Sequence, residues 1–193
     1  MQPKAKSWIG TYTGRKFYPY EPKPDDVSVE DIAHSLSLQC RFNGHCEQLY
    51  TVAQHSINCA KLLKELGYDV KYQLYALLHD ASEAYLSDLP RPVKEYMPEY
   101  YEVEQKVQDV IWEHFGLPKP TKEDWDIIYF ADNQLLYWEG VKLTKNIDNW
   151  TERYNNLLNN FSPPEDWFEE KLPSEVKNEF ISLLEKLLKE VIE

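Results

Sequence analysis

The stretch Tyr75-Ala-Leu-Leu-His-Asp-Ala-Ser-Glu-Ala-Tyr85 decides both the fold class and where a site should be sought. Its first residues belong to an apolar run with helical spacing, and the adjacent pair His79-Asp80 stands at the end of that run. A divalent cation is bound by imidazole nitrogens and carboxylate oxygens that converge from different elements. The stretch therefore predicts a helix that delivers two metal ligands to the interior of a helical domain.

Two further residues on helical patterns can complete such a site. His55 lies on or beside the apolar face of one predicted helix. Asp132 follows Ile128 by one turn in another, so it faces the core or a pocket in it. Buried carboxylates without a partner cost on the order of several kcal/mol each, and a cation removes that cost. We expect one divalent ion to be held by His55, His79, Asp80 and Asp132.

The N-terminal part predicts a small β-structure ahead of the helices. Aromatic and β-branched residues on both sides of Thr13-Gly14 predict a short β-hairpin within residues 7–20. Ser28 has the place of a helix N-cap, and Asp31 stands where a capping box prefers Glu. Thr51 can cap the helix that carries His55.

The remaining pattern predicts a single all-α domain over residues 1–193. No change of composition marks an internal boundary, so we expect a core over about 25–140 and a C-terminal helical extension over about 150–193. Apolar residues at helical spacing, bounded by Gly and Pro, predict helices over 28–38, 51–66, 70–86, 98–115, 121–140 and 174–192, with one more over 150–160.

Composition narrows the classes of partner. The chain has 193 residues, of which 42% are hydrophobic and 14% aromatic, which is typical of a globular protein. The net charge of -12 would repel a nucleic-acid polymer, whereas a small phosphorylated ligand could still bind in a pocket with local cations. The first residues do not resemble a signal peptide, no run approaches about 18 apolar residues, and the three cysteines include no CxxC. We expect a soluble cytoplasmic protein with free thiols and no membrane partner.

The four proposed ligands, in this order, resemble those of the HD-domain metal-dependent phosphohydrolases. The resemblance extends through residues 50–56, 79–92 and 130–136 and covers roughly residues 25–140. Within that family the chain is similar to bacterial 5'-deoxynucleotidases and to phage dATP triphosphohydrolases. The resemblance implies a compact HD-type helical bundle and a nucleotide as the substrate.

The resemblance also implies roles for two acids after the His-Asp pair. Glu83 and Asp88 stand three and eight residues beyond Asp80, as acids do in the nucleotidases. By resemblance, Glu83 orients or deprotonates the attacking water, and the alternative is a solvated helix acid. Asp88 would accept a hydrogen bond from the 3'-hydroxyl of the sugar, and the alternative is a loop cap.

The remaining substrate contacts are expected before His55 and after the His79-Asp80 pair. Arg41 and Phe42 precede His55 by about fourteen residues, where the family carries Arg and an aromatic residue; the nucleotidases have Trp in place of Phe42. Arg41 could neutralise phosphate charge and Phe42 could crowd a 2'-hydroxyl. His45 could contact phosphate or make a structural hydrogen bond. Lys94, like Arg91, could reach the β- or γ-phosphate or stay solvated.

We therefore expect a metal-dependent phosphohydrolase acting on a deoxynucleotide, as a monophosphate or a triphosphate. Hydrolysis of a signalling nucleotide and non-catalytic nucleotide binding are the alternatives. A mixed nitrogen and oxygen ligand set suits Mn, Fe, Co, Ni or Zn, and Mg less well. The amphipathic helix over 174–192 could form a homodimer or could pack on its own domain.

Overall fold

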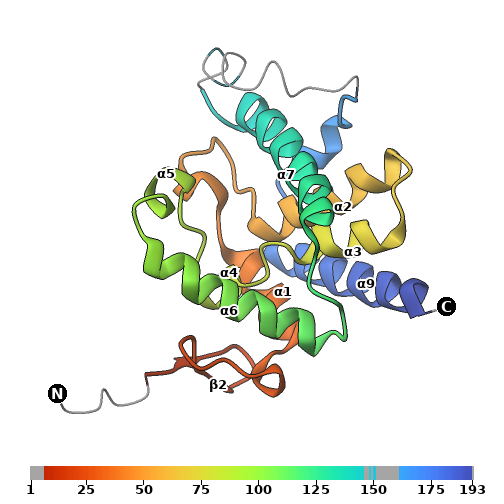
Figure 1. Ribbon diagram of the computed structural model, residues 1–193. Coiled ribbons are helices and arrows are strands. Elements are labelled where there is room, and N and C mark those ends of the chain that lie inside the picture. Colours follow the sequence, from red (N-terminus) through yellow and green to blue (C-terminus); the bar gives the residue numbers. More distant parts are fainter. Residues whose placement is uncertain (1–6, 146–147, 149, 151–160, 193) are drawn as a thin grey trace.

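The protein, described by a computed structural model over residues 7–145, 148, 150 and 161–192, is built mainly from α-helices. The helices are α1 (Val29–Leu38), α2 (Val52–Glu65), α3 (Val70–Leu78), α4 (Glu83–Leu86), α5 (Arg91–Lys94), α6 (Pro98–His114), α7 (Lys122–Leu143) and α9 (Pro173–Ile192). The described residues also include the 3₁₀ turns η1 (Pro24–Asp26), η2 (Arg41–Gly44) and η4 (Glu165–Phe168). Figure 1 shows this arrangement, which confirms the all-α class.

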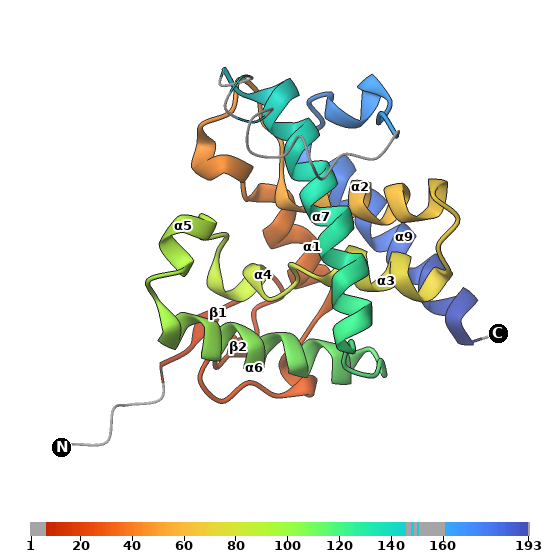
Figure 2. The ribbon, with the colours of Figure 1, turned by 45° about the horizontal axis from the view of Figure 1, so that its top comes forward.

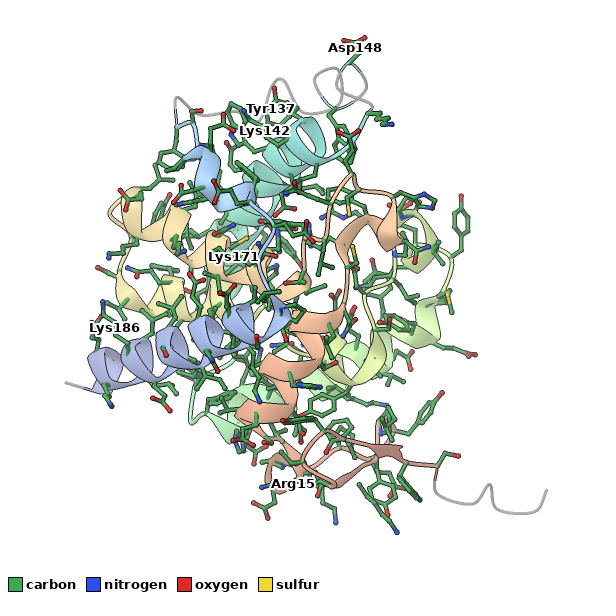
Figure 3. All side chains as sticks on the ribbon, turned by 180° about the vertical axis from the view of Figure 1, so that it is seen from behind. Arg15, Tyr137, Lys142, Asp148, Lys171 and Lys186 are labelled. Atoms are coloured by element: carbon green, nitrogen blue, oxygen red, sulfur yellow. The ribbon has the colours of Figure 1, made fainter. Side chains whose placement is uncertain are left out.

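The expected hairpin is present at the N-terminal side. Strands β1 (Ile9–Gly10) and β2 (Lys16–Phe17) pair antiparallel, with Ile9 opposite Phe17. In Figure 3, Arg15 of this hairpin and Lys142 near the end of α7 lie at opposite ends of the molecule. The hairpin is therefore remote from that end of α7.

Two clusters of buried side chains form the core. The larger one includes Phe17 and residues of α1, α2, α3, α6 and α9, and the smaller one joins α2 to α7 and η4. Helix α9 packs against α1, α2 and α3 (Figures 1 and 2). Its buried residues Val176, Phe180, Leu184 and Leu187 belong to the larger cluster. The C-terminal amphipathic helix thus packs on its own domain.

The helix caps agree with the sequence in one expected place and differ in another. Thr51 forms a full capping box with Gln54 at the start of α2. The box expected at Ser28 is wrong, because Ser28 makes no side-chain cap. The carboxylate of Asp31 instead accepts hydrogen bonds from the backbone N–H of Thr13, at 2.7 Å, and from its hydroxyl, at 2.9 Å. Asp31 therefore ties the hairpin turn to α1.

The helix expected over 70–86 is interrupted, and this break shapes the site. Helix α3 ends at Leu78 and α4 begins at Glu83. Gln108 of α6 donates its amide to the carbonyl of Leu78 at 2.9 Å and accepts the N–H of Ser82 at 3.0 Å. Those two backbone groups would bond to each other in a continuous α-helix. The side chain from α6 replaces that hydrogen bond and lets the chain turn at His79.

Two further expectations concern segments of the chain. The helix expected over 150–160 lies, apart from residue 150, outside the described residues. Within the part of the chain that the structure describes, no helix combines the length and apolarity needed to cross a bilayer.

Candidate metal centre and substrate pocket

Both predicted histidine ligands are anchored through Nδ1. His55 of α2 has no exposed surface, and its Nδ1 lies 2.7 Å from the Glu139 carboxylate. The Nδ1 of His79 lies 2.7 Å from the carbonyl oxygen of Ala76. A carbonyl only accepts, so the proton of neutral His79 belongs on Nδ1 and the lone pair on Nε2. This Nε2 is buried and has no hydrogen-bond partner among the described residues.

The two predicted aspartates face the free edges of these rings. Asp132 of α7 brings a carboxylate oxygen to 3.2 Å from Nε2 of His55. The Asp80 carboxylate lies 3.2 Å from Nε2 of His79 and 3.9 Å from Nε2 of His55. Ligands that share one cation at about 2.1 Å stand about 3 Å apart. Each histidine Nε2 thus lies 3.2 Å from one predicted carboxylate, which is the spacing of neighbouring ligands on one cation, and a cation would satisfy the unpartnered Nε2 of His79.

A buried thiol lies beside the same cluster. His55, Cys59 and His79 each offer one ligand atom, and these atoms lie within 4.8 Å of one another, so the group could hold a metal ion. Sγ of Cys59 lies 3.4 Å from Nε2 and 4.0 Å from Nδ1 of His55, which places it beside the ring rather than beyond the Nε2 lone pair. Burial raises the pKa of this thiol to about 11. Its spacing, four residues after His55 on α2, is the sequence signal that would have found it.

The charges of the cluster depend on one another. Burial disfavours the charge of Asp80, but His79, His55 and Arg41 hold its pKa far below the ordinary value. Burial also opposes the charge of Asp132, yet His55 and His79 lower its pKa to about 2. Both carboxylates are therefore ionised at neutral pH and are suited to bind a cation.

A buried acid and a half-buried acid stand next to the ligands. Glu83, on the first turn of α4, is only 4% exposed, and one of its carboxylate oxygens has no hydrogen-bond partner in the described chain. Burial, with Asp80 and Asp88 as negative neighbours, raises the pKa of Glu83 well above its ordinary value. Burial also raises the pKa of Asp88. A carboxylate with a raised pKa accepts a proton more readily than an ordinary aspartate or glutamate does.

The expected cations are held by carboxylates. Lys94 donates to Glu83 at 3.0 Å and to Glu104 at 2.6 Å. Although burial opposes the charge of Lys94, these two acids raise its pKa above the ordinary value. Arg91, largely exposed, donates to Asp132 at 3.0 Å. Both cations are thus tied to the site instead of being freely solvated.

Arg41 is the most buried of these cations. It is 8% exposed, donates from Nε to Glu139 at 2.9 Å, and places Nη1 4.0 Å from Asp80. Burial opposes its charge, but Glu139 and the aspartates of the site raise its pKa above the ordinary value. The turn that follows it is unusual, because Phe42, Asn43 and Gly44 all have positive φ, at 55°, 52° and 77°. Such left-handed backbone is costly for Phe and Asn and often marks a functional loop.

Most of the predicted site residues line one cavity of about 1050 Å³. It lies between α7 and the segment that carries α4 and α5, which face each other in Figures 1 and 2. His55 is buried and does not line this cavity. His45 is exposed. The ring of Phe42 meets that of Trp150 edge-on, with centroids 5.7 Å apart. The predicted residues that line the cavity are Arg41, Phe42, His45, His79, Asp80, Glu83, Asp88, Lys94 and Asp132.

Several residues of the site were not anticipated from the sequence. Glu139 stands seven residues after Asp132, two turns along the same face of α7, and that spacing is a signal that could have found it. Trp125 and Tyr129 stack at 5.2 Å on the wall of the cavity. The partner Glu104 of Lys94 carries no motif, so only the fold identifies it.

Comparison with known proteins gives similarity without an activity. No family model matches the chain. Over 112 residues it is 43% identical to the uncharacterized protein YfdR of Escherichia coli K12, a match that covers 58% of this chain and 60% of that protein. It is 35% identical over 118 residues to an uncharacterized protein of Rhodobacter capsulatus, again across 58% of this chain and 60% of the relative. The chain thus spans about 60% of the length of these curated relatives.

Proposed function

We propose that the protein is a metal-dependent phosphohydrolase of nucleotides, with deoxynucleotides as its preferred substrates. The observation that carries the proposal is the clustering of two imidazoles and two carboxylates, of which all but His55 line a large cavity that also contains cations. Both histidines are held through Nδ1, so that each can present Nε2 to one divalent ion. A cavity of this size accommodates a nucleotide.

A divalent ion held by His55, His79, Asp80 and Asp132 would polarise a phosphoryl oxygen and make a bound water more acidic. Among the chain's own groups, Glu83 is the best candidate to take the proton of the attacking water. Its carboxylate is buried beside the ligands and has one oxygen free of hydrogen bonds in the described residues. The pKa of Glu83, raised by burial and by Asp80 and Asp88, suits a proton acceptor that must later release its proton.

Phosphate recognition is assigned to the cations of the cavity. Arg41 is fixed at Nε by Glu139, so its terminal nitrogens can meet phosphate oxygens as a pair. Lys94 stands at Glu83 and can exchange that carboxylate for a phosphate group. Acidic side chains line the same cavity, so a bound divalent ion would add to the positive charge that these two residues offer a phosphate group.

Sugar selectivity is proposed for Asp88 and Phe42, which lie on either side of His79-Asp80 in the sequence and both line the one cavity. Asp88 would accept the 3'-hydroxyl, and the ring of Phe42 would crowd a 2'-hydroxyl. The sequence resemblance to HD-domain 5'-deoxynucleotidases and dATP triphosphohydrolases supports these roles, and we infer that the helical core is an HD-type bundle.

Phosphate release from a nucleotide panel tests the proposal. Protein freed of metal with a chelator is supplied with Mn²⁺, Co²⁺, Zn²⁺ or Mg²⁺ and incubated with dAMP, AMP, dATP, ATP and a cyclic nucleotide. We expect metal-restored release from the deoxynucleotides, absent from an Asp80→Ala preparation. Absence of release from every substrate with every metal would overturn the proposed function. Turnover of the cyclic nucleotide alone would replace the deoxynucleotide assignment by a signalling substrate.

A further inference from the structure

We infer that Glu139 is a positioning residue that sets two parts of the site at once, the ring of His55 and the guanidinium of Arg41. Its consequence for turnover rests on the proposed function, whereas its action on the imidazole does not. One carboxylate oxygen lies 2.7 Å from Nδ1 of His55, and the other lies 2.9 Å from Nε of Arg41. Glu139 itself has no exposed surface.

The two partners come from different elements, and α7 joins them. His55 belongs to α2, against which α7 packs (Figures 1 and 2), and Arg41 begins the η2 turn. The same helix carries Asp132, whose carboxylate meets the opposite nitrogen of His55 at 3.2 Å. His55 is thus held between Glu139 at Nδ1 and Asp132 at Nε2. A shift of α7 would move Asp132 and Glu139 together. Through its hydrogen bonds, Glu139 would also shift the ring of His55 and the guanidinium of Arg41.

A carboxylate suits both partners, because each of its two oxygens can accept one of the two hydrogen bonds. It accepts from Nδ1–H of His55, which leaves the Nε2 lone pair for an ion, and it accepts from Nε–H of Arg41. An amide in its place has one oxygen and one NH₂ group. If the oxygen keeps Arg41, the NH₂ group donates to Nδ1 of His55 and moves the ring proton to Nε2. If the oxygen still accepts from His55, the NH₂ group faces the Nε–H of Arg41. Both groups are donors, so the hydrogen bond to Arg41 is lost.

Structural stabilisation by a buried ion pair is the competing explanation. A pair of this kind is weak evidence for stability, because desolvation offsets much of the attraction. The two explanations differ in what Glu139→Gln should do to folded protein. Mere stabilisation predicts a lower melting temperature with an unchanged imidazole. Positioning predicts, in protein that is still folded, either a changed tautomer of His55 with weaker ion binding or a displaced Arg41.

The test compares Glu139→Gln with Asp31→Asn, a second buried carboxylate whose partner is Thr13 in the remote hairpin. Mn²⁺ affinity is measured by calorimetry on metal-free protein, and the ring nitrogens of His55 are followed by ¹⁵N NMR. We expect Glu139→Gln to weaken Mn²⁺ binding by about 10- to 100-fold or to displace Arg41, as seen in KM. Asp31→Asn should change neither quantity. Wild-type Mn²⁺ affinity together with wild-type KM in folded Glu139→Gln overturns the inference.

Two further measurements separate this inference from the proposed function and from a folding defect. Arg41→Gln should raise KM, and its effect should be smaller in the Glu139→Gln background, because Arg41 is already misplaced there. In the metal-free wild type, ¹⁵N NMR should find the Nδ1 proton of His55 present; a ring protonated on Nε2 alone overturns the inference even if Glu139→Gln does not fold. Loss of Mn²⁺ affinity in Glu139→Gln of a protein without nucleotidase activity would sink only the proposed function.

Discussion

Lys94 donates a hydrogen bond to Glu83 at 3.0 Å. This contact joins the proposed general base, Glu83, to a residue proposed to bind phosphate, Lys94. The same ammonium group donates to Glu104 at 2.6 Å. Lys94 is therefore shared by two carboxylates. A phosphate group that took over Lys94 would release Glu83 from its ion pair and strengthen it as a base, since a nearby cation lowers the pKa of a carboxyl group.

Replacement of Glu83 separates chemistry from metal binding. Glu83→Gln should lower kcat by about 10²-fold or more, because the amide cannot accept a proton. Mn²⁺ affinity should stay near the wild-type value, since Glu83 is not one of the proposed ligands. Steady-state kinetics and a calorimetric titration provide the two readings. A kcat near wild type would assign Glu83 to a purely structural role.

Removal of a proposed metal ligand, unlike replacement of Glu83, should reduce metal binding as well as turnover. His79→Ala and Asp80→Ala should each lose bound metal and turnover, because each variant removes one of four donor groups. Elemental analysis after dialysis measures retention, and His114→Ala, outside the cavity lining, provides the matched control. Full metal occupancy in both ligand variants would refute the ligand assignment.

Sugar selectivity is tested at Phe42 and Asp88. The wild type should prefer dAMP to AMP, or dATP to ATP, and should handle 2',3'-dideoxy analogues poorly, because a buried hydrogen-bonding group penalises a missing hydroxyl. Phe42→Ala should narrow the deoxy-to-ribo ratio of kcat/KM with little loss on the deoxy substrate. Asp88→Asn should weaken both sugars. Equal ribo and deoxy rates in the wild type would remove the deoxy-selective assignment and leave the metal site untouched.

The local sequence pattern predicted where several residues of the candidate site lie. It did not predict features that depend on contacts between residues far apart in the sequence. His55 and Asp132 could be predicted because helical spacing alone places them on inward faces. The break after Leu78 could not, because it depends on Gln108, thirty residues further along, whose amide replaces a backbone hydrogen bond. Glu139 was missed for a related reason. A glutamate in a helix is usually exposed, and only the packing of α7 on α2 buries it.

The Gln108 contact gives a stability prediction. Gln108→Leu should leave the N–H of Ser82 without its side-chain partner, at a cost of about 1–3 kcal/mol if it stays unsatisfied, whereas the carbonyl of Leu78 keeps its hydrogen bond from the N–H of Ala81. If the two groups bond to each other instead, α3 lengthens and His79 turns away from the cavity. Either outcome should appear, as a lower midpoint in urea or as weaker Mn²⁺ binding. An unchanged midpoint together with unchanged Mn²⁺ affinity would show that Gln108 does not hold the break.

Acid should weaken the attachment of α9 through Glu179. Lys61 of α2 and Lys171 each donate to this half-buried carboxylate, at 2.7 and 3.0 Å. Burial alone would raise the pKa of Glu179, but the two lysines lower it below the ordinary 4.5. A carboxyl group whose pKa is lower in the folded state stabilises the fold above the unfolded-state pKa and loses that contribution as the pH falls through the folded-state pKa. The wild type should therefore melt above Glu179→Gln at pH 7, and the gap should close below about pH 4.5.

Salt should reduce the difference in melting temperature between the wild type and Glu179→Gln at pH 7. The side chains of Glu179 and its two lysine partners are about one-third exposed, so solvent ions screen their charges. Glu185→Gln, at an exposed position on the same helix, is the matched control and should melt close to the wild type at both pH values. Thermal melts of the three proteins at pH 7 and pH 3.5, with and without about 0.5 M salt, roughly three times physiological ionic strength, give the comparison. A gap that persists unchanged at pH 3.5 would mean that Glu179 acts through packing of its side chain and not through its charge.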